Sequence, residues 1–233
     1  MKILHTSSLA STLDALNEVF FMGHMLTKPE RREIATWIAG RQGLKGAYRG
    51  MFAPTPLDFK RGISLFTGER VVSGAAIGHI LGEESSRALI LLDGGSPAVR
   101  EALMKSNKGM LRALMSCETP NRVRGFYCCG TCTAALWRHL AVGGLGKSKR
   151  RLSAGLEVLK KYRDGAGKWR RFPFYYTLLA LSEIGGKLAI DERRYAAPVC
   201  EQLLKRYKSK NKIAKRRRIL LERILAKSCW GTV

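Results

Sequence analysis

The chain has 233 residues, of which 45% are hydrophobic, so it can fold around a core and is not a disordered basic tail. It carries 42 Lys and Arg against 18 Asp and Glu, a formal net charge of +24 at pH 7. The longest apolar run, residues 88–92, is far shorter than the roughly 20 residues that cross a bilayer. Asp14 and Glu18 interrupt any signal-peptide core near the N-terminus. We therefore expect a cytoplasmic protein without a transmembrane segment.

The expected helices follow one another along the whole chain, and no alternating strand pattern accompanies them. Ser11 or Thr12 can cap the first helix, and Pro29 suits the first turn of the second. Further helices are expected over residues 58–66, 74–92, 97–115, 131–142, 152–162, 174–184, 192–207 and 213–227. These segments predict an all-α fold in a single domain, residues 1–233, with basic C-terminal helices, residues 192–227, docked on it.

Two segments, residues 37–66 and 162–181, share one order of residue types. In each, a helix end is followed by a cation, a Gly-rich turn, an aromatic residue, a proline and a further apolar helix. Tyr48 and Trp169 are expected to fold over the turn and to fill the space between neighbouring helices. Units of this kind bury their apolar faces by stacking on one another, which predicts antiparallel helical hairpins.

The turns themselves, "RQGLKGAY" at 41–48 and "YRDGAGKW" at 162–169, resemble the helix-joining motifs of the terpenoid-cyclase and protein-prenyltransferase superfamily. The resemblance covers about 60 residues and implies an α/α toroid-like or open superhelical arrangement. It also implies a prenyltransferase-like domain that binds a phosphorylated ligand, with an isoprenoid as one candidate, in an apolar cavity with a basic rim. The chain has no Asp-x-Asp-Asp motif and no evident Asp, Cys and His zinc set of that superfamily. The resemblance therefore indicates a fold more than it indicates a particular reaction.

Cysteines are concentrated between residues 126 and 140, where Cys129 and Cys132 form a C-x-x-C pair at an expected helix start. The helix dipole there favours a thiolate. Three interpretations are open: a metal site, a redox pair, and small buried residues at a close helix contact. For a metal site, Cys128, Cys132 and His139 would share a face if the helix extended back to residue 128. Cys117 or His79 could complete such a set. Since the chain is long and shows no secretion signal, its six cysteines do not indicate a disulfide scaffold.

His79 and Glu83 lie one turn apart on an expected helix. A histidine and a carboxylate at this spacing can transfer protons or hold a metal, whereas the alternative is a packed inner helix with a hydrogen-bonded histidine. Asp58 is an acid at a helix start and suits a cap better than a catalyst. If the protein is a catalyst, the candidate residues are His79, Glu83, Asp58, Cys129 and Cys132. The sequence identifies no cofactor.

The large cation excess predicts an anionic partner, because a surplus of like charge destabilises the folded chain. The candidates are a phosphorylated small molecule, a nucleic acid and an anionic membrane surface; a solvated surface without a specific partner is the alternative. Cations alternate with aromatic residues over 163–176, which suits phosphate contacts combined with stacking. The candidate ligand-binding residues are Arg163, Lys168, Trp169, Arg170, Arg171 and Tyr48.

The C-terminal segment, residues 205–227, adds eleven Lys and Arg with one Glu. It motivates the second functional hypothesis, a nucleic-acid-binding helical-repeat protein that contacts phosphates through its basic loops and its last helix. No helix-turn-helix, zinc-finger or RNA-binding signature accompanies these charges.

Overall fold

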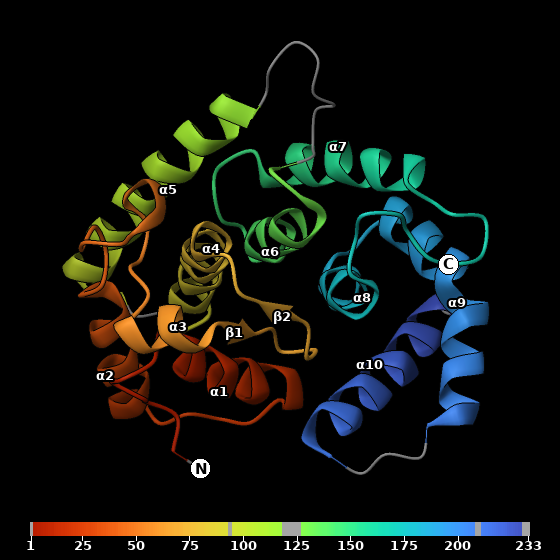
Figure 1. The fold of residues 1–233 in the computed structure, drawn as a ribbon, viewed down its shortest axis with the longest axis horizontal. Helices are drawn as coiled ribbons and strands as arrows, with labels where there is room; N and C mark the ends of the chain where they lie inside the picture. The colour runs from red at the N-terminus through yellow and green to blue at the C-terminus, as the bar shows by residue number, and fades with distance from the viewer. Residues whose placement is uncertain (1, 93–94, 118–126, 208–210, 230–233) are drawn as a thin grey trace.

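The computed structural model describes residues 2–92, 95–117, 127–207 and 211–229 (Figure 1). Ten α-helices, one short 3-10 helix and one two-stranded hairpin make up this part of the chain, which confirms the all-α class. The elements are α1 (Leu9–Met22), α2 (Lys28–Ala39), η1 (Tyr48–Gly50), α3 (Pro56–Arg61), β1 (Ile63–Ser64), β2 (Arg70–Val71), α4 (Gly74–Leu92), α5 (Pro97–Cys117), α6 (Gly130–Ala141), α7 (Ser148–Lys161), α8 (Phe174–Glu183), α9 (Lys187–Arg206) and α10 (Lys212–Cys229).

Local signals explain most helix starts. Ser8, rather than Ser11 or Thr12, caps α1, and its hydroxyl accepts a hydrogen bond from the backbone N–H of Ser11. Thr27 and Thr55 form capping boxes with the acid three residues later, and a proline occupies the first turn of both helices. Helices α7 and α9 begin four and five residues before the expected positions, at Ser148 and Lys187.

The predicted helix over residues 58–66 is wrong in its second half. Helix α3 ends at Arg61 because Gly62 adopts a left-handed backbone, with a φ of 67°. The chain then forms a small antiparallel hairpin in which Ile63 pairs with Val71 and Ser64 with Arg70.

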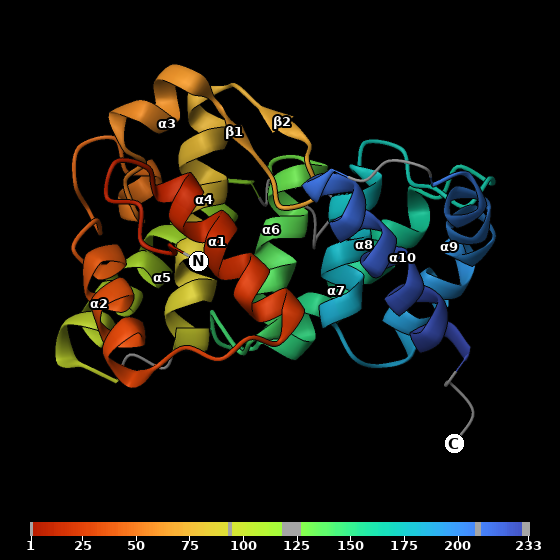
Figure 2. The same cartoon turned by 90° about the horizontal axis from the view of Figure 1, so that it is seen from below.

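Helices α4, α6 and α8 form the inside of the molecule. In Figure 1 they are seen nearly end-on, whereas α5, α7 and α9 lie largely in the plane of the view and outside them. Inner and outer helices therefore alternate along the chain from α4 to α9. Helix α1 packs against α4, and α10 packs against α8 and α9 (Figure 2). Closure of this arrangement into a toroid stays a prediction.

A buried polar network joins the inner helices to α1. The Arg138 guanidinium on α6 donates to Glu183 on α8, with Nε 3.0 Å from Oε2, and to Glu84 on α4, with Nη1 2.5 Å from Oε1. It also donates to Asn17 on α1, and so does Arg87 on α4. Arg138 and Arg87 lower the pKa of Glu84 although burial alone would raise it. The network fixes how the inner helices lie against one another.

A buried arginine, Arg216, joins helix α10 to α1. The Arg216 side chain is 1% exposed, donates to Asp14 and Glu18 on α1, and lies over the Phe66 ring at 4.0 Å. Lys215 and Arg218 on the same helix are exposed.

Within the described residues, no helix is both long and apolar enough to cross a membrane.

The two repeated turns have similar local geometry. Each closes through an isolated antiparallel bridge, Gln42 with Phe52 in the first and Arg163 with Trp169 in the second. Trp169 fills the space between α8 and α9, as predicted: it is 4% exposed and its Nε1 donates to Glu192 at 2.7 Å. Tyr48 instead lies over α4, stacked on His79.

Candidate metal centre

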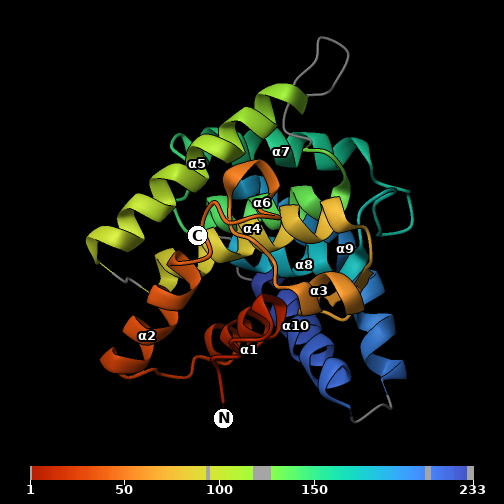
Figure 3. The ribbon, with the colours of Figure 1, turned by 60° about the vertical axis from the view of Figure 1, so that its left-hand side comes forward.

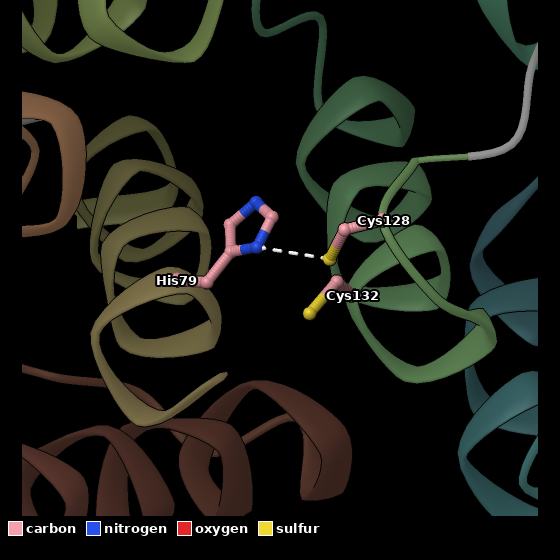
Figure 4. A group of neighbouring side chains, drawn as sticks. All are labelled: His79, Cys128 and Cys132. Atoms are coloured by element: carbon pink, nitrogen blue, oxygen red, sulfur yellow. Dashed lines mark hydrogen bonds between the residues drawn. The ribbon is translucent and has the colours of Figure 1, made fainter. Parts of the chain in front are cut away.

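One histidine and two cysteines from separate parts of the chain meet between α4 and α6. His79 projects from α4, and Cys128 and Cys132 lie at the start of α6, as Figure 4 shows. The candidate ligand atoms of these three residues all lie within 4.8 Å of one another. Two of the predicted catalytic candidates, His79 and Cys132, are therefore brought together, with Glu83 and Cys129 beside them.

Small residues on α4 allow the histidine to be enclosed. Gly78 leaves room for the side chain of Tyr48, because a Cβ there would lie 3.2 Å from the Cβ of Tyr48. The Tyr48 ring stacks on His79 with 4.5 Å between centroids, and the Tyr127 ring meets His79 edge-on at 4.2 Å. His79 is 2% exposed, so these aromatic rings hold the imidazole in one place.

The two nitrogens of His79 face different groups. Nδ1 lies 3.2 Å from Cys128 Sγ, and Nε2 lies 3.4 Å from Glu83 Oε1. The Glu83 carboxylate is fully buried, and within the described residues neither of its oxygens has a hydrogen-bond partner beyond this close approach. Burial raises the pKa of Glu83 to about 7, against the opposing effect of His79. The arrangement runs in a line from thiol to imidazole to carboxylate.

The three cysteines occupy different positions at the helix start. Cys129 is the N-cap of α6, so the helix does not extend back to Cys128, and Cys128, Cys132 and His139 do not share one helical face. Cys132 is 1% exposed, while Cys128 and Cys129 are exposed. Hydrogen bonds from the other two thiols lower the pKa of Cys129 to about 2, and the backbone N–H groups of Cys132 and Thr131 act in the same direction. The hydrogen bond to Cys129 in turn raises the pKa of Cys128.

His139 lies apart from the cysteines. It is completely buried, packs under Gly144, and neither ring nitrogen has a hydrogen-bond partner in the described part of the chain. Burial lowers its pKa to about 4. His79 is therefore the candidate nitrogen ligand, and the side chain of Cys117 lies outside the described residues.

Asp58 has a different task. Its carboxylate accepts hydrogen bonds from the Ser8 hydroxyl at 2.6 Å, from the Leu9 backbone at 3.0 Å and from the Thr55 backbone at 2.8 Å. It thereby joins the N-termini of α1 and α3, which agrees with the expectation of a capping residue.

The six candidate ligand-binding residues are divided by the structure. Arg163 is paired with Glu192 at 2.9 Å and stacks on the Tyr195 ring, and Trp169 is buried. Lys168, Arg170 and Arg171 are exposed. Tyr48 belongs to the wall of the histidine site.

The donor set suits a zinc-type ion. Thiolate and imidazole are the ligands that Zn²⁺ prefers, at about 2.3 Å from sulfur and about 2.0 Å from nitrogen. A metal-bound histidine commonly gives its second N–H to a carboxylate, and Glu83 lies at that nitrogen. Without a metal, the same line of groups could activate the Cys128 thiol as a nucleophile.

The sequence did not show which histidine faces the cysteines, since His79 and Cys128 are 49 residues apart. Tyr127, which closes one side of the imidazole, was missed altogether. An aromatic residue beside a cysteine cluster carries no distinctive spacing. The Gly-x-aromatic turn that ends in Tyr48 was visible, but its target on α4 was not.

Comparisons with known proteins add no assignment, because no family model, curated protein or solved structure matches this chain.

Proposed function

We propose that the protein binds a zinc ion through His79, Cys128 and Cys132, and that its function depends on this site. The observation that carries this proposal is the convergence of three soft ligand atoms within 4.8 Å. Two sulfurs and one nitrogen leave one position of a tetrahedral site for water or a substrate, which is the ligand count of catalytic rather than structural zinc. The exposed Cys128 places that centre at an accessible end of α6.

Glu83 supports the proposal independently. A carboxylate that is completely buried with no hydrogen-bond partner among the described residues is costly unless it takes up a proton or a positive charge compensates for it. An imidazole that binds Zn²⁺ through Nδ1 keeps a proton on Nε2, and this nitrogen lies 3.4 Å from Glu83 Oε1. A metal bound to the His79 imidazole would thus supply the positive charge that compensates the buried Glu83 carboxylate.

Zinc stoichiometry and affinity test the proposal. The wild-type chain and the variants His79→Ala, Cys132→Ala and Cys200→Ala would each be titrated with Zn²⁺ against a chromophoric chelator. Cys200 is a buried cysteine on α9 and serves as the matched control. We expect one tightly bound zinc per chain, lost in the first two variants and retained in the control.

Equal zinc binding by Cys132→Ala and wild type would contradict the proposal. A chain that binds no zinc, but whose Cys128 reacts with iodoacetamide in a manner that requires both His79 and Glu83, would replace it with the thiol nucleophile. The line of groups with 3.2 Å and 3.4 Å separations favours that alternative.

A second candidate function, binding of a phosphorylated amphiphile, is favoured by a separate groove. The groove has a volume of about 530 Å³ and lies between the ends of α6 and α8 and the starts of α7 and α9. Its lining is largely apolar, with Leu140, Leu152 and Leu188 among the residues, and Lys149 and Lys187 bring positive charge to it. The expectation of an apolar cavity with a basic rim motivates this second function.

Thermal shift measurements with farnesyl diphosphate and with pyrophosphate test this second function. Farnesyl diphosphate is expected to raise the melting temperature of the wild type more than pyrophosphate does, and to lose that advantage in Lys149→Gln/Lys187→Gln. No shift at a saturating concentration of farnesyl diphosphate would contradict it.

A further inference from the structure

Five exposed cations form what we call the basic edge, at the C-terminal end of α7 and along the turn that follows it. The turn folds back on the helix, since the Arg170 backbone N–H donates to the Tyr162 carbonyl at 2.8 Å and that of Arg163 donates to Lys160. The members of the basic edge are Lys160, Lys161, Lys168, Arg170 and Arg171.

Among the residues that the structure describes, four of the five cations of the basic edge make no polar side-chain contact, whereas Lys168 lies over the Phe174 ring at 5.7 Å. In the described part of the chain, the side chains of Lys160, Lys161, Arg170 and Arg171 make no hydrogen bond or ion pair, in contrast to the neighbouring Arg163. The exposed acids nearby are Glu157 and Asp164. Asp164 stays ionised, because its carboxylate accepts hydrogen bonds from the backbone of Ala166 and Lys168 and from the Tyr195 hydroxyl, so five cations stand against two acids. The edge therefore presents an excess of uncompensated positive charge.

The basic edge adjoins the candidate metal centre. Gly130, the first residue of α6, packs so closely against Arg171 that a Cβ on it would collide with the Arg171 carbonyl. Cys128 and Cys129 directly precede Gly130. Tyr48, which stacks on His79, is followed in sequence by the exposed Arg49. The positive charge of the basic edge thus lies next to the cysteine cluster.

The distribution of exposed apolar residues indicates what kind of anion fits. Among the described residues, the large hydrophobic side chains exposed to solvent all lie within residues 25–115, and the basic edge has none. A membrane surface would be expected to take up apolar side chains as well as cations. A hydrophilic polyanion needs only the cations, several of them spaced along a backbone.

We propose that the basic edge binds the phosphate backbone of a polynucleotide and brings it to the candidate metal centre. Lys160, Lys161, Arg170 and Arg171 neutralise successive phosphates, and Lys168 extends the contact along the turn. Delivery to the metal rests on the proposed zinc function, whereas binding at the edge does not.

Fluorescence anisotropy of labelled oligonucleotides, measured at several salt concentrations, tests the proposal. The probes are single-stranded DNA, single-stranded RNA and a DNA duplex, each of about 20 nucleotides, a length that spans several phosphate contacts. The edge variant, Lys160→Gln/Lys161→Gln/Arg170→Gln/Arg171→Gln, is compared with Lys205→Gln/Arg206→Gln/Lys215→Gln/Arg218→Gln. The second variant removes the same number of exposed cations from α9 and α10 and is the matched control.

The edge variant is expected to bind about tenfold or more weakly than the wild type. Its salt slope is expected to fall by about 0.7 for each phosphate of a single strand that the variant no longer neutralises. The control is expected to stay within about threefold of the wild type. Equal weakening in both variants, no binding by the wild type, or preferential binding to anionic vesicles would overturn the proposal. Zinc content is measured on the same samples, so that failure of the metal site and failure of the basic edge are seen separately.

Discussion

At the scale of single residues, Glu83 is the group whose burial most needs an explanation. We expect Glu83→Gln to lower zinc affinity by about 10- to 100-fold, because an uncharged partner holds a metal-bound imidazole less well. Chelator competition measures this decrease, and circular dichroism checks that the helices are retained. Glu157→Gln, a change at an exposed glutamate on α7, is the control. An affinity equal to that of the wild type would mean that Glu83 does not act on His79.

The burial of His139 predicts how the stability of the protein depends on pH. Burial lowers its pKa from 6.5 to about 4 in the folded chain, so between these values the unfolded chain binds more protons than the folded chain does. Above pH 6.5 this residue does not reduce the free energy of unfolding. As the pH falls from 6.5 to about 4, proton uptake by the unfolded chain lowers the free energy of unfolding, by ~3 kcal/mol at most. Urea unfolding of wild type and His139→Gln over this range should show a shallower decline in the variant. Parallel curves would contradict the assignment.

At the scale of helices, Arg138 joins α6 to α4, α8 and α1 through buried acceptors. Arg138→Met leaves the Glu84 and Glu183 carboxylates without their main cation, so we expect a decrease of about 3–5 kcal/mol in unfolding free energy. Arg150→Met, at an exposed position on α7, should change it by no more than about 0.5 kcal/mol. Chemical denaturation measures both, and a similar small effect of the two variants would show that the network does not hold the inner helices together.

The close contact at the start of α6 leads to a second prediction, for a substitution at Gly130. An alanine at Gly130 would place its Cβ against the Arg171 carbonyl, so the turn and the helix must separate. We expect Gly130→Ala to cost about 1–3 kcal/mol of stability and to weaken zinc binding, since Cys128 and Cys132 flank the displaced residue. Gly185→Ala is the control, because a Cβ there meets no atom within 4 Å and its φ is not left-handed. Unchanged stability and zinc affinity in Gly130→Ala would contradict this view of the contact.

Sequence patterns predicted the helices well and the contacts between them poorly. Apolar periodicity and the residues Pro29, Pro97 and Pro173 indicated most helix positions, since these signals act within a few residues. The hairpin of β1 and β2 was missed because each strand has only two residues. The early starts of α7 and α9 were missed because neither helix has a side-chain cap.

At the scale of the whole molecule, the candidate site depends on the packing of α4 against α6, which no local signal specifies. The residue types of the site were identified from the sequence, and Cys132, Cys129, His79 and Glu83 do lie together. The choice of His79 over His139 required the fold. Figure 3 shows α4 and α6 side by side in the middle of the molecule, where residues distant in sequence meet. The exposed cations of the basic edge lie at the end of α7 and along the turn that follows it.

X-ray absorption spectroscopy of the zinc-loaded protein is the decisive measurement for the zinc centre, because it counts the atoms bound to the metal. We expect two sulfurs at about 2.3 Å and one imidazole nitrogen at about 2.0 Å, with one further light atom in the open position. Cys132→Ala, which is expected to lose the tightly bound zinc, should not show this first shell. A first shell made only of oxygen and nitrogen, or an unchanged sulfur count in that variant, would contradict a zinc centre at His79, Cys128 and Cys132.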